Sequence, residues 1–323
     1  AAPFDTGRAA EKTQPMTLPR QLGPYQLIRK LGSGGMAQVH LALAFGASGF
    51  EKKVAIKSLL PELRGHGELQ RLLITEACLH ATLEHRNLVG VHDLGVADGT
   101  YYVRMDFVDG GDLASMMKFG RPSVSLAIYI AEEVALALHY VHTFSDDRGR
   151  PMGLVHRDVS PSNILLSRGG EVKLADFGVA KATHLADATG ARVRKGKYAY
   201  MSPEQIAGDA LTHQSDQFGL GVTIMEMIVG HRPFDGETVL ETMEKIRESA
   251  PPALEGVTPE LQTIIRRCLE RRPKSRYPSA LALRQALMSL RSRFLAVGPP
   301  ELQEYVVAAA VEGPSIADAK TQV

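Results

Sequence analysis

The residues of this chain that are best suited to chemistry lie on either side of a predicted β-hairpin. Asp158 and Asn163 precede the hairpin in the run His156–Asn163, and Asp176 follows it in an Asp-Phe-Gly triplet. Phosphoryl transfer needs an acceptor for the proton of the attacking hydroxyl, and it needs oxygen ligands for magnesium, a hard cation. Two carboxylates and one amide supply these chemical types, so the spacing indicates a phosphoryl-transfer site.

A glycine cluster near the start of the chain is suited to holding phosphates. The segment Leu31–Val39 joins two predicted strands, and its glycine amides could approach phosphate oxygens without obstruction from Cβ atoms. A dinucleotide-binding fingerprint is disfavoured because Val39 begins a strand rather than a helix. A Walker A loop is excluded because no Gly-Lys-Ser/Thr follows. Taken alone, the cluster is equally compatible with a plain turn.

Lys57 ends the predicted central strand Val54–Lys57 and could place its ammonium against phosphates under the glycine cluster. Glu76, on the helix that follows, is the natural carboxylate partner. A lone lysine on a strand is more often a solvated edge residue. The functional interpretation of Lys57 therefore depends on its occurring together with the acids and the amide downstream.

The elements that position these residues change in character after Gly110 and Gly111. Short β-rich runs dominate the region before these glycines, at 25–28, 39–42, 54–57 and 101–103, with one amphipathic helix at about 68–83. Helical periodicity dominates afterwards, at 125–142, 214–229, 240–248, 259–269 and 279–295, interrupted by a hairpin of two short strands at 164–166 and 172–174. The fold class is therefore α+β, with a small antiparallel sheet lobe that carries one main helix and a larger, mainly helical lobe.

Three further motifs complete an ordered set: Ser202–Glu204, a run that begins at Asp216, and Arg276. The whole set, across about residues 25–292, resembles the eukaryotic-like serine/threonine protein kinase family, in a bacterial-looking form. The resemblance implies the two-lobed protein kinase fold. It also implies transfer of the γ-phosphoryl group of Mg-ATP to serine or threonine hydroxyls of protein substrates, with autophosphorylation.

The resemblance also implies roles for single residues. Asp158 would be the catalytic base, Lys57 would bind the α- and β-phosphates and pair with Glu76, and Asn163 and Asp176 would hold magnesium. Glu204 and Arg276 match a structural ion pair, and Asp216 matches the acid that braces the catalytic loop. The residues expected to contact ATP are Leu31, Gly32, Ser33, Gly34, Gly35, Met36, Ala37, Gln38, Val39, Ala55, Lys57, the gatekeeper Met105, Val108 of the hinge, Asp112 and Leu165.

Some positions depart from the family pattern. Ala37 replaces the third glycine of the loop, and Ser160 stands where serine/threonine kinases usually carry a lysine. We hypothesise that Lys197 reaches into the space left at Ser160, and that Thr183 or Thr189 accepts a regulatory phosphate. Ser160 and Ala37 also leave open the alternative of a pseudokinase that binds nucleotide and acts as a signalling scaffold.

Composition limits the setting and the partners. The 323 residues carry 37 basic and 36 acidic side chains, and a net charge of +1 provides no global attraction for nucleic acid. Two cysteines without metal-ligand spacing favour a reducing, cytoplasmic setting, and we expect neither a signal peptide nor a membrane segment. The expected organisation is a flexible leader at 1–24, a kinase domain at 25–295, with lobes at 25–108 and 109–295, and a linker or tail at 296–323.

Overall fold

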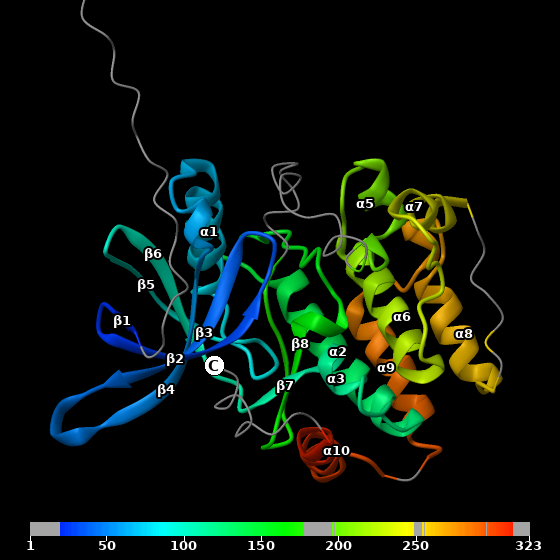
Figure 1. The fold of residues 1–323 in the computed structure, drawn as a ribbon. Helices are drawn as coiled ribbons and strands as arrows, with labels where there is room; N and C mark the ends of the chain where they lie inside the picture. Colours follow the sequence, from blue (N-terminus) through cyan, green and yellow to red (C-terminus); the bar gives the residue numbers. More distant parts are fainter. Residues whose placement is uncertain are drawn as a thin grey trace, which may run out of the picture.

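The computed structural model describes residues 20–177, 196, 198–248, 254, 256–294 and 296–312. An antiparallel sheet with one long helix lies beside a larger helical body (Figure 1). The six-stranded sheet has the order β1-β2-β3-β4-β6-β5. Its strands are β1 Arg20–Leu22, β2 Tyr25–Ser33, β3 Ala37–Phe45, β4 Glu51–Leu59, β5 Val91–Ala97 and β6 Thr100–Asp106.

Alternation along β4 decides which side chains of the small lobe reach the cleft side. Val54 and Ile56 belong to an apolar cluster on one face of the sheet, together with Tyr102. Ala55 and Lys57 therefore point to the opposite face, because successive side chains of a strand alternate. Helix α1, Gly67–His80, packs through Leu73 and Ala77 against Leu59 and Val103. The small lobe thus has two apolar clusters, and Lys57 lies on the helix side of the sheet.

The large lobe is built around the long helix α3, Val124–Thr143, which packs against α6, His213–Val229, and α9, Ala280–Arg291. The other helices within the described residues are α2 Leu113–Met116, α5 Pro203–Ala207, α7 Val239–Glu248, α8 Pro259–Cys268 and α10 Pro299–Glu312. Short 3₁₀ turns occur at η1 Ala47–Gly49, η2 Pro61–Leu63, η3 Pro161–Asn163 and η6 Pro273–Ser275. A three-stranded sheet joins β7 Gly110–Asp112, β8 Ile164–Ser167 and β9 Val172–Leu174 in the order β7-β8-β9.

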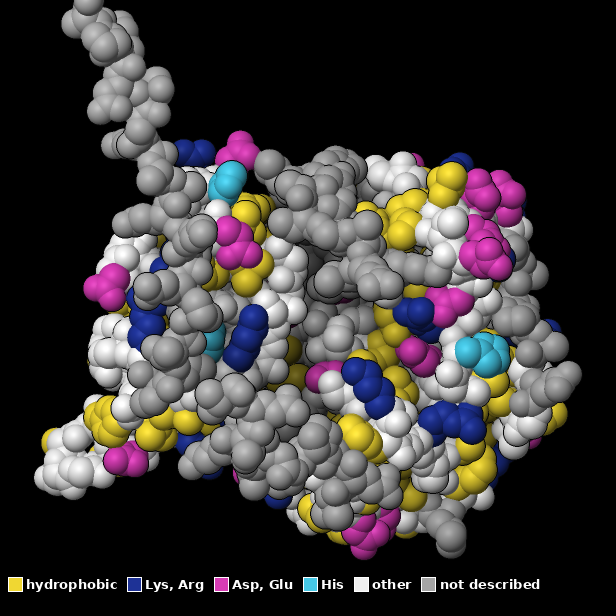
Figure 2. Space-filling model, in the orientation of Figure 1, with side chains coloured by type: hydrophobic (Ala, Val, Ile, Leu, Met, Phe, Trp, Pro, Cys, Tyr) yellow, Lys and Arg dark blue, Asp and Glu magenta, His cyan; other side chains and the backbone are white. Residues whose placement is uncertain are grey.

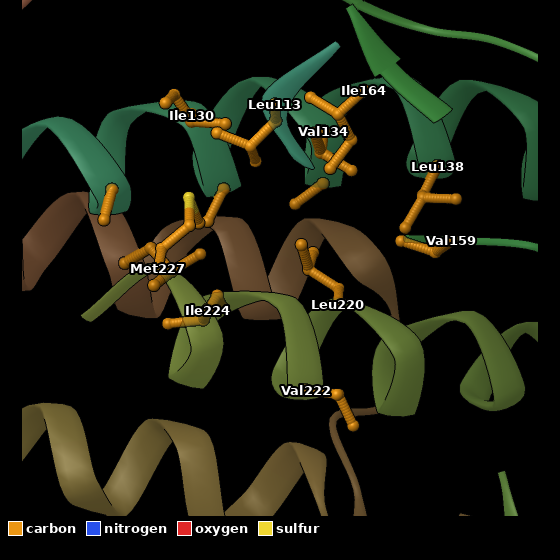
Figure 3. Packing of buried hydrophobic residues seen from close by; sticks show 14 of the residues in the cluster. Leu113, Ile130, Val134, Leu138, Val159, Ile164, Leu220, Val222, Ile224 and Met227 are labelled. Carbon is orange, nitrogen blue, oxygen red and sulfur yellow. The ribbon is translucent and has the colours of Figure 1, made fainter. Parts of the chain in front are cut away.

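The core of the large lobe reaches the polar segments singled out in the sequence. Val159 and Ile164 are both buried in the cluster that contains Leu138 of α3 and Leu220 of α6 (Figure 3). Val159 directly follows Asp158, and Ile164 directly follows Asn163. Close packing of these apolar neighbours fixes the backbone of the intervening polar residues. The core therefore holds the candidate catalytic loop in place.

Helix α3 has the length and apolar character that a membrane span would need. Twelve of its residues are buried inside the protein, from Leu126 to Val141. Two of these, Glu132 and Glu133, are ion-paired to Arg291 and Arg86. The helix is therefore explained as the core helix of the large lobe.

The two-lobed α+β fold predicted from the sequence is confirmed, and each predicted helix and strand has a counterpart. Six of the described helices and strands were not expected. Strands β5 and β7 and helices α2 and α5 have no predicted counterpart, β1 lies within the predicted leader, and α10 occupies the segment predicted as a linker or tail. In α10, Leu302 and Val306 are buried in the core cluster of the large lobe. The predicted domain boundaries at residues 24 and 295 remain predictions.

Candidate active site

A buried ion-pair cluster joins the two lobes. Lys57 Nζ lies 2.8 Å from Glu76 Oε1 and 2.7 Å from Asp176 Oδ1. Burial alone would lower the pKa of Lys57, but the nearby Asp176 and Glu76 carboxylates outweigh it and raise the pKa above its usual range. Lys57 is therefore a fixed positive charge, held by one acid from the small lobe and one from the large lobe.

The sheet register places Lys57 beside the glycine hairpin. Lys57 on β4 pairs with Val39 on β3, and Val39 pairs with Gly32 on β2. Within the hairpin, the Gly34 amide donates to the Ala37 carbonyl at 2.7 Å. A Cβ added at Gly32 would meet no atom within 4 Å. The hairpin backbone is thus open beside the lysine, whereas Ala37 is itself buried opposite Leu59.

The catalytic-loop candidates are linked to the cluster by backbone contacts. Asn163 Nδ2 donates to the Asp158 carbonyl at 2.8 Å, and the Ala175 amide donates to the Asn163 carbonyl at 2.8 Å. Ala175 directly precedes Asp176, whose carboxylate reaches Lys57. An unbroken series of contacts therefore connects Asp158, Asn163, Asp176 and Lys57.

Asp216, near the start of α6, braces the backbone of the catalytic loop. Its carboxylate accepts the His156 amide at 2.8 Å and the Arg157 amide at 2.7 Å, and it contacts His142 Nε2 at 2.7 Å. Arg157 has φ of +70°, a left-handed conformation that costs about 1–2 kcal/mol for a residue with a side chain. Burial opposes the charge on Asp216, but the hydrogen bond and charge of His142 lower its pKa. A charged acceptor thus stabilises the strained turn.

A second buried ion pair supports the large lobe away from the cleft. Arg276 donates through Nη1 and Nη2 to the two carboxylate oxygens of Glu204, at 2.7 and 2.9 Å. Ser215 Oγ donates to Glu204 Oε1 at 2.8 Å. Burial would raise the pKa of Glu204, but the Arg276 hydrogen bonds and charge keep it below the usual value. The pair ties α5 to η6.

The residues expected around the nucleotide base and ribose are gathered near β6, β7 and β8. Ala55 pairs with Met105 across β4 and β6, and Asp112 pairs with Leu165 across β7 and β8. Val108 lies in the short connection between β6 and β7. The Asp112 carboxylate accepts the Ser115 amide at 2.8 Å and so caps α2. Asp112 therefore has a structural role in addition to its predicted contact with ribose.

A groove of about 820 Å³ opens beside the catalytic loop. It is lined by Ser33 and Gly34 of the glycine hairpin, by Ser160 and Ser162, and by residues of the α2–α3 and α6 regions. The two serine hydroxyls are 3.0 Å apart, and Ser160 is buried. On the face shown in Figure 2, basic and acidic side chains are interspersed over both lobes. The groove has the size to hold an extended peptide segment.

The candidate regulatory residues Thr183, Thr189 and Lys197 lie outside the described residues, so the regulatory hypotheses that rest on them remain predictions.

His80 has no chemical role in the sequence interpretation, yet it lines the same small pocket as Lys57, Glu76 and Asp176. Its Nε2 accepts the Phe177 amide at 3.3 Å, and its ring makes an edge contact with Phe177, with 4.2 Å between centroids. Its position one helical turn after Glu76 was the available signal.

Comparison with known proteins gives matches over most of the chain. The sequence model of the family described as protein kinase domain matches residues 25–288. The chain is 38% identical over 282 residues to tyrosine-protein kinase MasK of Myxococcus xanthus, covering 84% of this chain and 44% of that protein. It is 34% identical over 277 residues to serine/threonine-protein kinase PknA of Mycobacterium tuberculosis, covering 84% and 62%. It is 32% identical over 263 residues to serine/threonine-protein kinase PrkC of Bacillus subtilis, covering 80% and 39%.

Each of these relatives is longer than the region matched, because the chain spans between 39% and 62% of their lengths. Among solved structures, the kinase domain of Mycobacterium tuberculosis PknI is similar, with a TM-score of 0.62 and 28% identity. The similarity covers 85% of this chain and 99% of that domain. The match extends over both lobes.

Proposed function

Because this chain belongs to the protein kinase family, we propose that it transfers the γ-phosphoryl group of magnesium-bound ATP to serine and threonine hydroxyls of protein substrates. The observation that carries the proposal is the Lys57–Glu76–Asp176 cluster, which draws one charged residue from a strand, one from a helix and one from the opposite lobe. Structural ion pairs seldom place a buried lysine between two acids beside a glycine hairpin and an open groove.

The residues present fit a magnesium-bound nucleotide. The Asp176 side chain is 41% exposed although it contacts Lys57, so its carboxylate remains accessible to a cation. Asn163 uses its amide nitrogen in the contact with Asp158, which leaves its side-chain oxygen as a ligand. Carboxylate and amide oxygens suit magnesium, and the open backbone at Gly32 suits phosphate. Asn163 and Asp176 would hold the metal.

The chain would contribute positioning and charge compensation rather than covalent chemistry. Magnesium, when bound, neutralises charge on the transferring phosphoryl group. Lys57 would hold the α- and β-phosphates, and Glu76 would keep the ammonium in place. Asp158 would accept the proton of the substrate hydroxyl, so that the oxygen can attack phosphorus as ADP leaves. The strained turn at Arg157, held by Asp216, fixes the direction of that carboxylate.

The assignment to serine and threonine is supported by the relatives PknA and PrkC, whose names give that specificity. Tyrosine is a second candidate, favoured by the similarity to MasK and by Ser160. Ser160 is neutral and hydrogen-bonded to Ser162. A lysine at this position would hold the γ-phosphate close to the short hydroxyl side chain of a serine or threonine substrate. Use of ATP as the phosphoryl donor favours a cytoplasmic location for this chain. The proposal also includes autophosphorylation, the transfer of phosphate to hydroxyls of the chain itself.

Incubation of the purified chain with Mg-ATP and matched peptides that carry serine, threonine or tyrosine tests the proposal. We expect phosphate on serine and threonine peptides, and loss of transfer in Asp158→Asn and Lys57→Met. Lys53→Met, at an exposed position of the same strand, serves as the matched control and should stay active. Phosphate on tyrosine alone would support the second candidate. A pseudokinase would be supported if the chain binds nucleotide but transfers phosphate neither to any peptide nor to itself. Intact-mass measurement detects phosphate on the chain itself.

A further inference from the structure

Helix α1 presents two buried polar side chains to the cleft, one turn apart. Glu76 and His80 are spaced four residues apart and therefore lie on the same face of the helix. Glu76 reaches Lys57, whereas His80 reaches Phe177. Both side chains are at most 8% exposed. The same helix face thus touches the lysine and the residue after Asp176.

The contact of His80 with Phe177 is made to the backbone as well as to the ring. Nε2 of His80 accepts the Phe177 amide, which belongs to the peptide group that directly follows Asp176. Burial first, and then the charge of Lys57, lower the pKa of His80 to about 3, so the ring is neutral and able to accept. A buried amide without an acceptor would be destabilising. The hydrogen bond therefore fixes the orientation of this peptide group.

Asp176 needs this support because its backbone is strained. Its φ is +54°, in the left-handed region that side-chain-bearing residues seldom adopt. On its other side, the carbonyl of Ala175 accepts a hydrogen bond from Nε2 of His156, in the catalytic loop, at 3.2 Å. Asp176 is therefore fastened at both flanking peptide groups, once to the catalytic loop and once to α1. Relaxation of the strained backbone would turn the carboxylate away from Lys57.

We propose that His80 is a positioning residue, whose acceptor nitrogen holds Asp176 in the conformation that places its carboxylate at Lys57. The inference deepens the proposed function and rests on it, because it depends on Asp176 acting as a ligand of the metal. The same helix thus holds Glu76 directly at Lys57 and reaches the peptide group after Asp176 through His80.

Replacement of His80 separates the hydrogen bond from packing. His80→Leu keeps an apolar body but removes the acceptor, whereas His80→Gln restores an acceptor oxygen at a similar reach. We expect kcat to fall about ten-fold in the leucine variant, with the KM for peptide unchanged, and to recover largely in the glutamine variant. The Phe177 amide, followed by NMR in ¹⁵N-labelled protein, should exchange with solvent about ten-fold faster in the leucine variant alone. His66→Leu, at the exposed start of the same helix, is the control.

A leucine variant with wild-type kcat and unchanged exchange at Phe177 overturns the inference. So does equal loss in the leucine and glutamine variants, which would assign the role to the aromatic ring. If the wild-type chain transfers no phosphate, the proposed function fails, and the Phe177 exchange rates still decide whether His80 holds this peptide. Circular dichroism on each variant shows whether the fold is retained.

Discussion

At the scale of single residues, the charge of Lys57 depends on two carboxylates that come from different lobes. Without them, burial would favour the neutral amine. The two acids are not equivalent. Glu76 is buried beside the lysine, whereas the Asp176 side chain is 41% exposed and remains open to a cation. Glu76 therefore serves to hold the ammonium, whereas Asp176 contacts the lysine from a position that solvent can reach.

We expect Glu76→Gln to lower kcat about ten-fold or more, because an amide keeps the hydrogen-bonding shape but removes the charge that holds the ammonium. ATP would still bind through the glycine hairpin, so the KM for ATP should rise less than kcat falls. Steady-state kinetics with a peptide substrate measure both quantities. Glu68→Gln, at an exposed position of the same helix, should match wild type. Equal kinetics for the two variants would remove Glu76 from the mechanism.

The residues of this cluster differ in how far the sequence could predict them. Lys57, Glu76 and Asp176 stood out because a lysine on a strand, a carboxylate on a helix and an acid before glycine complement one another chemically. His80 did not, because its partner is the backbone amide of Phe177, 97 residues away. A backbone partner leaves no signature in side-chain types. The spacing of His80 from Glu76 indicates that both lie on one helix face, but the contact with Phe177 follows only from the folded arrangement of α1 against this segment.

At the scale of elements, the Glu204–Arg276 pair joins two short segments of the large lobe, α5 and the turn η6 that precedes Arg276. Helix α5 has only five residues, and η6 is a single 3₁₀ turn. Neither can bury much apolar surface by itself. Arg276 is 2% exposed and also donates to the carbonyls of Gln214 and Glu270, so it connects α5 with the start of α6 and with the turn after α8. The ion pair thus adds to the apolar contact that Ile206 of α5 makes with the core cluster of the large lobe.

The pH dependence of stability should report this pair. The pKa of Glu204 is lowered on folding, so its contribution is present above the unfolded value of about 4.3 and is lost as pH falls through the lower folded value. Glu204→Gln should therefore lower the melting temperature at pH 7, and the difference from wild type should shrink below about pH 4. Thermal unfolding followed by circular dichroism measures this. Glu260→Gln, which breaks an exposed pair with Arg293, should change little at either pH.

Two elements show why the remaining part of the fold was not predicted. Strand β5 contains Gly95, where an added Cβ would lie 2.3 Å from the Tyr102 hydroxyl oxygen of β6. Close approach across the sheet requires glycine there, and glycine weakens the alternating pattern that identifies a strand. Helix α10 begins at two prolines, Pro299 and Pro300, and prolines after Gly298 predict a linker or tail. Proline is tolerated in the first turn of a helix, so the alanines and Val306 that follow can form one.

At the scale of the whole molecule, the large lobe extends its core to the C-terminal helix. Leu302, Val306 and Ala309 of α10 belong to the same cluster as α3 and β8. Tyr305 donates through its hydroxyl to the Gly120 carbonyl at 2.8 Å, before α3. Figure 1 shows α10 lying below β7 and α2, next to the strands that carry Asp112 and Leu165. The large lobe therefore includes residues beyond Gly298, which pack into its core.

Shortening one buried side chain of α10 should test this extension. Leu302 is fully buried, so Leu302→Ala should cost about 2–5 kcal/mol of unfolding free energy, through lost burial and the cavity left behind. The matched control is Val307→Ala on the same helix, where the valine is 45% exposed and the cost should stay below about 1 kcal/mol. Urea unfolding of both variants gives the free energies. A larger loss from the exposed valine would contradict the packing of α10.

Because the helix lies beside β7 and β8 rather than against Lys57, kcat at a temperature where Leu302→Ala is folded should stay near wild type. A large loss of kcat in the folded variant would instead make α10 part of the support for the nucleotide side of the cleft.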